Sequence, residues 1–227
     1  MLVLRLVLTF AAMTLVAGTV LFGAAGTLAW PMGWLYVILV STVSVGSRVL
    51  LLWLSPDTLR ERANFAKVRG VEPGDRALVM IVGTAGPMAV LLVAGLDHRF
   101  GWTGPLPPAA IRGAVAAALT GAGVTTWAMA VNKFFSAVAR IQSDRGHVVV
   151  SRGPYAWVRH PGYAGSVLAT LAIPVMLGSL WGLVPAGLTA SAIVVRTARE
   201  DRMLRRGLAG YEVYAAHTRY RLLPGLW

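Results

Sequence analysis

The stretch PGYAGSVLATLAIPVMLGSLWGLVPAGLTASAIVVRTARED, residues 161–201, decides how this chain folds. Its middle, from about 163 to 195, is apolar and about long enough for two short membrane crossings, since a full crossing takes about 20 apolar residues. A hairpin of this kind returns Arg196 and Glu200 to the membrane face that holds Arg159-His160-Pro161. The sequence therefore predicts that two polar motifs, well separated along the chain, form one site.

Composition predicts an integral membrane protein. Hydrophobic residues make up 56% of the 227 positions and charged residues only 13%, a balance that a soluble domain of this size cannot hide from water. We expect an all-α bundle of five or six transmembrane helices, of which the last two form the tight hairpin. Cysteine is absent, which excludes disulfides and thiolate metal sites, and we assign no metal site. The apolar stretches cover residues 2–29, 33–54, 77–96, 110–131, 163–179 and 181–195.

The net charge of +12 reflects membrane topology rather than nucleic acid binding. Of the 21 Lys and Arg residues, five lie in 55–76, five in 132–160 and seven in 196–221, and six spans place these segments on one face. The positive-inside rule makes that face cytoplasmic, together with both termini and the predicted site. We also expect some affinity for anionic lipid headgroups there, and a location in a bacterial or archaeal plasma membrane.

The chain is expected to form one structural domain with two functional parts. Residues 1–131 hold the first spans and an interfacial segment, 55–76, which opens with the helix-start signal Ser55-Pro56-Asp57. Residues 132–227 hold a cytosolic cofactor-binding cap, the hairpin and a C-terminal amphipathic helix that we expect to end at Gly210. The apolar run after Arg5 lacks a convincing cleavage site, which predicts an uncleaved first span rather than a secretory signal.

The two polar motifs have the chemistry of a site for a zwitterion. Pro161 suits the first turn of a helix, where its missing N–H would have no partner, and the free amides that follow can hold an anion. Arg196 and Glu200 are one helical turn apart, so they can face one pocket as a cationic fork and an anionic acceptor. With aromatic rings nearby, such a pocket suits S-adenosylmethionine, although these residues alone do not select it over a nucleotide.

Four motifs, in this order, closely resemble the isoprenylcysteine carboxyl methyltransferase family, whose broader group includes phospholipid N-methyltransferases. The resemblance is strong over about 132–227 and extends more weakly to Glu61-Arg62 and Gly74-Asp75-Arg76. It implies methyl transfer from S-adenosylmethionine inside a membrane domain that has no Rossmann fold, and the chain contains no G-x-G-x-x-G. The motifs are Gln142 to Val150, Gly153-Pro154-Tyr155, Arg159-His160-Pro161-x-Tyr163-x-Gly165 and Arg196-x-x-x-Glu200-Asp201.

The resemblance also implies roles for individual residues. Arg196 is expected to orient the acceptor's carboxylate, as the catalytic and substrate-binding residue. Two departures from the family pattern concern the acceptor more than the cofactor: a shorter loop between Gln142 and His147, and Asp201 where a run of glutamates is common. The residues expected to hold the cofactor are Gln142, His147, Val148, Val149, Val150, Tyr155, His160, Pro161, Gly162, Tyr163 and Glu200.

Chemistry favours a carboxylate as the methyl acceptor. A carboxylate is nucleophilic at neutral pH, whereas an amine or phenol needs a proton acceptor, and the motifs offer few besides His147, His160 and Glu200. A pocket at this depth can be reached sideways from the bilayer, which indicates a lipid-like acceptor such as a prenylcysteine or an isoprenoid acid. A phospholipid amine, an NADPH-dependent reductase of the sterol type and a non-catalytic membrane scaffold stay open as alternatives.

Two charged features also have plainer interpretations. Arg196 and Glu200 can be an ordinary surface pair on one helix, worth only about 0.3–0.5 kcal/mol. Arg48 lies inside the second span, and we expect its side chain to reach towards the cytoplasmic side, with a polar ligand contact as the alternative.

Overall fold

Helices form all the regular structure in the described part of the chain, residues 2–63 and 70–227 of a computed structural model. The side chains of residues 2–7, 60 and 63 also lie outside the description, so the predictions for Arg5 and for 64–69 within segment 55–76 fall outside the described residues. The elements are α1 (Leu2–Ala25), α2 (Pro31–Leu54), α3 (Pro56–Ala63), α4 (Asp75–Met80), η2 (Ile81–Ala85), α5 (Gly86–Phe100), α6 (Pro108–Val131), η3 (Ser143–Arg145), η4 (Gly153–Ala156), α7 (Pro161–Met176), α8 (Leu183–Gly207) and α9 (Tyr211–His217).

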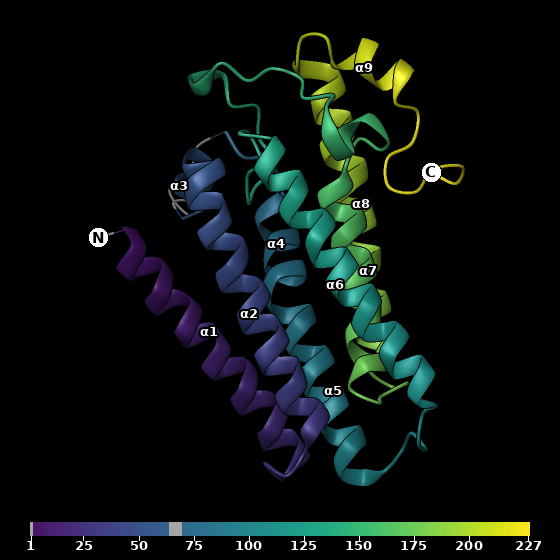
Figure 1. The fold of residues 1–227 in the computed structure, drawn as a ribbon. Helices are drawn as coiled ribbons and strands as arrows, with labels where there is room; N and C mark the ends of the chain where they lie inside the picture. Colours follow the sequence, from purple (N-terminus) through teal and green to yellow (C-terminus); the bar gives the residue numbers. More distant parts are fainter. Residues whose placement is uncertain (1, 64–69) are drawn as a thin grey trace.

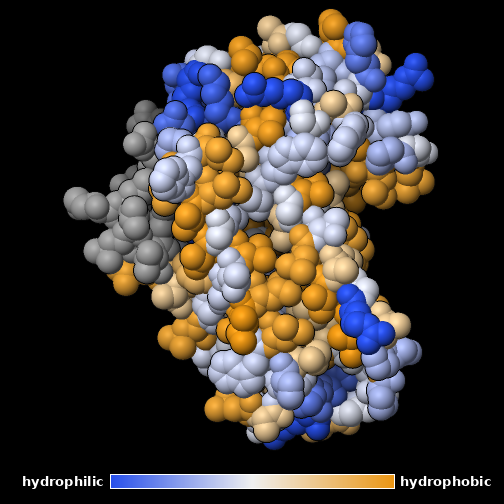
Figure 2. Space-filling model, viewed as in Figure 1, coloured by the Kyte–Doolittle hydropathy of each residue, from blue (hydrophilic) through white to orange (hydrophobic). Residues whose placement is uncertain are grey.

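The predicted helical membrane bundle is confirmed. Four helical segments are long and apolar enough to cross a membrane: Leu8–Ala25, Pro31–Leu54, Asp75–Phe100 and Pro108–Val131. α7 is shorter, with 16 residues, and α8 carries its apolar half before Arg196. Long helices run side by side, and the surface has an apolar band at mid-height with hydrophilic residues towards both ends (Figures 1 and 2).

Two helices differ in detail from the sequence prediction. The span expected at 181–195 and the amphipathic helix after it form one helix of 25 residues, α8, which stops before Gly210 because Leu208 leaves the helical conformation. Gly210, with a φ of 80°, instead begins α9. The third span contains the π-helical turn η2 just before Pro87, whose missing N–H interrupts the regular hydrogen bonding of a helix.

Small residues bring the helices that carry the polar motifs into close contact. Gly121 of α6 and Gly165 of α7 face each other so closely that a Cβ on either would collide with the other's carbonyl. The Thr125 hydroxyl donates hydrogen bonds to the carbonyls of Gly121 and Gly162, at 2.9 and 3.2 Å. Tight packing of this kind is the usual basis of helix association in membranes, and it fixes the start of α7 against α6.

The cap segments gather at one end of the bundle, called the cap end here, together with α3 and the C-terminus (Figure 1). The final strap, residues 218–227, runs back to the Arg159-His160 motif. The Arg159 and His160 backbone N–H groups donate to the carbonyls of Tyr220 and Arg221, both at 2.9 Å. The strap therefore holds the Arg159-His160 motif in place at the N-terminal end of α7.

A polar clasp closes the opposite end of the bundle. The buried carboxylate of Asp97 accepts hydrogen bonds from the Thr103 backbone N–H and hydroxyl, both at 2.7 Å, and from the Ser179 hydroxyl. The Ser179 hydroxyl also accepts the Gly182 N–H at 2.9 Å. These bonds join the α5–α6 loop to the turn of the α7–α8 hairpin, so α7 and α8 are held at both ends.

Candidate active site

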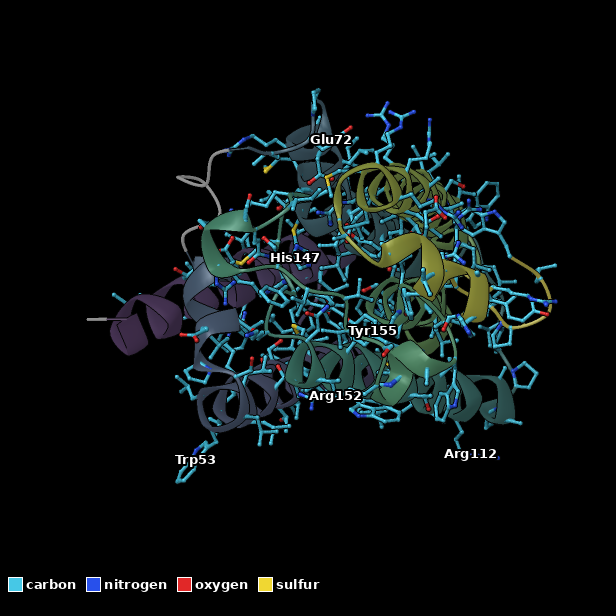
Figure 3. The ribbon with its side chains drawn as sticks, turned by 90° about the horizontal axis from the view of Figure 1, so that it is seen from above. Trp53, Glu72, Arg112, His147, Arg152 and Tyr155 are labelled. Carbon is cyan, nitrogen blue, oxygen red and sulfur yellow. The ribbon has the colours of Figure 1, made fainter. Side chains whose placement is uncertain are left out.

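A cavity, called the cap cavity here, lies where the cap covers the ends of α7 and α8. Seen from the cap end, His147 and Tyr155 lie within the outline of the molecule, whereas Trp53 and Arg112 point outward at its edge (Figure 3). Its lining comes from the segment 132–152 between α6 and η4, called the cap loop here, from η4, α7, α8 and α9, and from residues that adjoin these elements. The lining residues are Asn132, Phe134, Phe135, Ser136, Val138, Arg140, His147, Val148, Val149, Val150, Tyr155, Arg159, His160, Tyr163, Glu200, Leu204, Leu208, Tyr211 and Tyr214.

The cap cavity is narrow. Its volume is about 80 Å³, whereas pockets for small molecules usually measure roughly 300–1,000 Å³. The cavity as it stands is therefore too small for a ligand the size of a nucleoside.

Most of the predicted cofactor residues line this cavity. Gln142, Pro161, Gly162 and Arg196 are outside its lining. The eight that line it are His147, Val148, Val149, Val150, Tyr155, His160, Tyr163 and Glu200.

Glu200 and Tyr163 form a pair across the α7–α8 hairpin. The Tyr163 hydroxyl donates a hydrogen bond of 2.6 Å to Glu200 Oε2. The pairing depends on the antiparallel hairpin, since the two residues are 37 positions apart in the chain. It gives the cavity one carboxylate that is oriented by a neighbouring phenol.

His147 sits in the cap loop as a neutral imidazole. Its Nδ1 accepts the Gln142 backbone N–H at 3.3 Å, and its ring packs on Phe134 with 4.5 Å between centroids. Burial, and then the charges of Arg140 and Arg145, lower the pKa of His147 to about 4. The cavity therefore has an uncharged hydrogen-bonding ring at this point under neutral conditions.

Three predicted residues outside the lining support it from behind. The fully buried Gln142 donates from Nε2 to the Phe134 carbonyl at 2.6 Å, which fixes the cap loop. Pro161 is the first residue of α7, as its missing N–H predicts. Gly162 lies against the Phe135 ring, which a Cβ at this position would strike.

Arg196, the fourth, is held in an ion pair behind the wall. Its Nε and Nη2 donate to the two oxygens of Asp75 at 2.7 and 3.1 Å, and Nη2 also donates to the Ala137 carbonyl at 2.7 Å. The guanidinium stacks over the Tyr163 ring, 5.3 Å from its centroid. The structure therefore places Arg196 one layer outside the cap cavity, with its charge compensated.

Asp201, which the sequence analysis names only as part of the last motif, is a buried centre of charge. Its side chain is 0% exposed and contacts Arg159 at 2.7 Å, Tyr211 at 2.9 Å and Arg221 at 3.0 Å. Arg205 and His160 complete the set at 3.2 and 3.3 Å. Burial would raise the pKa of Asp201, but hydrogen bonds from His160, Arg159 and Arg221 lower it well below its usual range. The sequence offers only Arg205, one helical turn after Asp201, as a signal, because Arg159 and Arg221 are 42 and 20 positions away.

Two further hollows connect the cap cavity with the membrane side of the bundle. The first, of about 470 Å³, shares Phe134 and Val148 to Val150 with the cap cavity and also contacts Lys133 and Arg152. The second, the α2–α6 groove, has about 480 Å³, lies between the two helices and shares Leu54 and Ala130 with the first. From the α2–α6 groove to the cavity wall, the hollows therefore follow one another through shared lining residues. The groove is apolar, whereas the hollow next to the cavity also has polar and charged sides from Ser55, Lys133 and Arg152.

The side chains that line the cavity fit a zwitterion with a flat aromatic part. Glu200 offers an acceptor for a cationic or hydroxyl group, while Tyr155, Tyr211 and Tyr214 offer ring surfaces and Val148 to Val150 cover one side. Within the described residues no cluster of acidic, histidine or cysteine side chains suited to a metal occurs. The site thus combines an oriented carboxylate with apolar surfaces.

Comparison with known proteins agrees with the motifs. The isoprenylcysteine carboxyl methyltransferase (ICMT) family model matches residues 114–206, from within α6 almost to the end of α8. No curated protein matches the chain. The family resemblance predicted from the motifs is confirmed over the matched residues.

Proposed function

Because residues 114–206 match the isoprenylcysteine carboxyl methyltransferase family, we propose that this membrane methyltransferase uses S-adenosylmethionine to methylate the carboxylate of a lipid-like acceptor. The family match supports a methyltransferase in a membrane, and it suggests a prenylcysteine-like acceptor. An isoprenoid acid has the same two parts, an apolar tail and a carboxylate. The proposal places the cofactor in the cap cavity and the acceptor's tail on the membrane side.

The observation that supports the proposal is the wall that the cap cavity shares with the hollow beside it, which in turn adjoins the apolar α2–α6 groove. Phe134 and Val148 to Val150 line both the cap cavity and the hollow that continues into the α2–α6 groove. A polar ligand on one side and an apolar tail on the other can therefore meet at this wall. A water-soluble acceptor has no apolar tail to bury in a groove that faces the hydrocarbon of the membrane.

The chain's own residues would bind the cofactor and exclude water from it. S-adenosylmethionine, when bound, would supply a methyl group on a sulfonium, whose sulfur leaves as a neutral thioether when the acceptor's oxygen attacks the methyl carbon. Glu200 is suited to its cationic or hydroxyl groups, the tyrosines to its base, and Val148 to Val150 to keeping water out. Alignment of the reacting groups is the protein's main contribution to a displacement of this kind.

Proton chemistry at the site favours a carboxylate over an amine. His147, with a pKa of about 4, is a weak base, and Asp201, surrounded by arginines, is a weaker one. Glu200 is engaged by Tyr163, and His160 faces Asp201 and Tyr211. A carboxylate acceptor needs no proton removed, so it suits these groups better than a phospholipid amine.

We also place the cap end, and with it the active site and both termini, on the cytoplasmic side. The described residues of the three basic segments lie at the cap end, as the positive-inside rule requires for a cytoplasmic face. Protease accessibility of a C-terminal tag in sealed, right-side-out vesicles tests this orientation, and cleavage from outside would contradict it.

Cofactor binding tests the proposed function directly. We expect the purified protein in nanodiscs to bind labelled S-adenosylmethionine and the Glu200→Gln variant to lose most of that affinity. The matched control is Glu212→Gln, an exposed acid on α9 that pairs with Arg205 outside the cavity. Binding of NADPH without S-adenosylmethionine would support a reductase instead, and binding of neither would support a scaffold.

The acceptor is identified by its product. Incubation of a lipid extract with labelled cofactor, followed by mass analysis, should give a product whose label is released by mild base as methanol, because an ester is base-labile. Label that survives base would indicate methylation of a phospholipid amine.

A further inference from the structure

Three arginines at the cap end are buried, namely Arg140, Arg159 and Arg196, and all three are paired with acidic side chains. The chain has nine acidic residues, and all of them lie in the described part of the structure. Arg159 pairs with Asp201 and Arg196 with Asp75, while Arg140 pairs with both Glu61 and Asp144. Each of these buried arginines therefore has at least one carboxylate.

Arg62, on α3, has no such partner. None of the nine acidic side chains forms an ion pair with it in the described structure, and its neighbour Glu61 is bound to Arg140. Its Nη1 contacts the Ser136 carbonyl at 3.5 Å, the limit of a hydrogen bond, and its guanidinium lies over the Phe135 ring, 5.4 Å from the centroid. A partly buried guanidinium with such weak partners is well suited to receive an anion.

The surroundings of Arg62 disfavour its positive charge, so a bound anion would stabilise it. Burial, and then the positive charges of Arg196 and Arg48, lower the pKa of Arg62 to about 10. Arg48 bonds to the Ser44 carbonyl at 2.9 Å, one turn farther from the cap end, so it does not reach towards the cap as expected. Arg48 therefore adds a second positive charge near Arg62 and supplies no negative charge to balance it.

The position of Arg62 beside the cap cavity connects this charge to the reaction. Phe135 and Ser136, its two contacts, both line the cavity. Tyr163 lines it too and is close enough to act on Arg62 electrostatically. An anion held at Arg62 would therefore lie beside Phe135 and Ser136, at the wall of the proposed cofactor site.

We propose that Arg62, rather than Arg196, binds the acceptor's carboxylate. This inference rests on the proposed function and makes it more specific. Arg196 already has both oxygens of Asp75 and the Ala137 carbonyl on its donors, so an acceptor would have to displace them. Among the residues that the structure describes, the Ser136 carbonyl at 3.5 Å is the hydrogen-bond acceptor that Arg62 has to release. Arg196 then positions Tyr163 and the cap loop.

Two probes of the same shape isolate the charge. N-acetyl-S-farnesylcysteine offers a prenylated carboxylate without a free amine, and its carboxamide is uncharged. We compare direct binding of both labelled probes to the wild type, Arg62→Gln, Arg62→Lys and Arg196→Gln. Arg112→Gln is the control, because Arg112 is an exposed arginine at the far end of α6. Binding of S-adenosylmethionine to each variant reports whether the cap cavity is intact.

We expect Arg62→Gln to weaken binding of the acid roughly 10- to 100-fold, since a hydrogen-bonded charge pair is lost, while binding of the carboxamide and of S-adenosylmethionine stays within about twofold. Arg62→Lys should recover part of the loss. Equal weakening of acid and carboxamide by Arg62→Gln would show a structural role and overturn the proposal. So would loss of acid selectivity in Arg196→Gln but not in Arg62→Gln.

A different result would contradict the proposed function, namely carboxyl methylation. A wild-type protein that binds the acid but transfers no methyl group to it contradicts the proposed carboxyl methylation. The binding comparison between acid and carboxamide still decides the role of Arg62 in that case.

Discussion

Tyr163 donates a hydrogen bond of 2.6 Å to Glu200, and this bond joins the first turn of α7 to the cap half of α8 inside the cap cavity. The bond orients the carboxylate that we assign to the cofactor. Removal of the hydroxyl in Tyr163→Phe keeps the ring on which Arg196 stacks. We expect affinity for S-adenosylmethionine to fall about tenfold, because a hydrogen bond to a charged group is lost.

Isothermal titration of the purified variant measures this effect. Tyr220→Phe is the control, because Tyr220 lies in the strap outside the cavity lining. Unchanged or tighter binding in Tyr163→Phe would show that Glu200 does not depend on Tyr163 for its position.

Asp201 should matter for stability more than for chemistry. Asp201→Asn leaves Arg159 and Arg221, which both donate to it, without their shared carboxylate. Breaking a buried ion pair by removing one partner costs about 3–5 kcal/mol, so we expect a clearly lower melting temperature in detergent. Glu212→Gln, which removes an exposed partner of Arg205, should change stability by less than about 1 kcal/mol. Equal melting temperatures for the two variants would contradict this role for Asp201.

The sequence was sufficient to predict the helices and the meeting of the two polar motifs, because both follow from apolar length. It could not predict which acid pairs with which base. Arg196 and Glu200 fit one face of a helix, yet Arg196 turns to Asp75, 121 residues earlier. Pairing over such a distance depends on how α4 packs on α8, which no local pattern encodes.

The environment of Asp201 is a second feature that the sequence alone could not predict. Adjacent in sequence to Glu200, it points to a different environment, because successive residues on a helix lie about 100° apart. Glu200 therefore faces the cavity with Tyr163, while Asp201 faces the strap and its arginines. The contrasting roles of two neighbouring acids become visible only once α9 and residues 218–227 are in place.

His147 gives the protein a distinctive pH dependence. Its pKa in the folded protein is about 4, below the ordinary value of 6.5, so the unfolded chain binds more protons between these two values. The contribution of neutral His147 to stability is therefore fully present above about pH 6.5 and decreases as the pH falls towards 4. We expect His147→Gln to show a smaller loss of melting temperature between pH 7 and pH 4.5 than the wild type.

The control for this titration is His217→Gln, at the exposed end of α9, where the ring contacts the Val213 carbonyl. This variant should follow the wild-type curve. A His147→Gln curve parallel to that of the wild type would show that His147 is not held neutral by the fold.

The α2–α6 groove offers the sharpest test of acceptor access. Gly123 of α6 lines the groove, and a Cβ added there meets no atom within 4 Å, so a larger side chain fills the groove without straining the protein. We expect Gly123→Leu to raise the KM for a prenylated acceptor roughly tenfold, because the tail loses apolar surface to bury. Affinity for S-adenosylmethionine should stay unchanged, since Gly123 is outside the cap cavity lining.

Gly113→Leu is a matched control on the same helix. Its added Cβ also meets no atom within 4 Å, but Gly113 is outside the groove lining, so the substitution has similar effects on helix propensity without narrowing the path. Kinetics of both variants in nanodiscs separate the two effects. If Gly123→Leu and Gly113→Leu behave alike, the tail does not enter between α2 and α6. If only Gly123→Leu loses activity, and the loss grows with tail length, the groove is the path by which the acceptor reaches the cap.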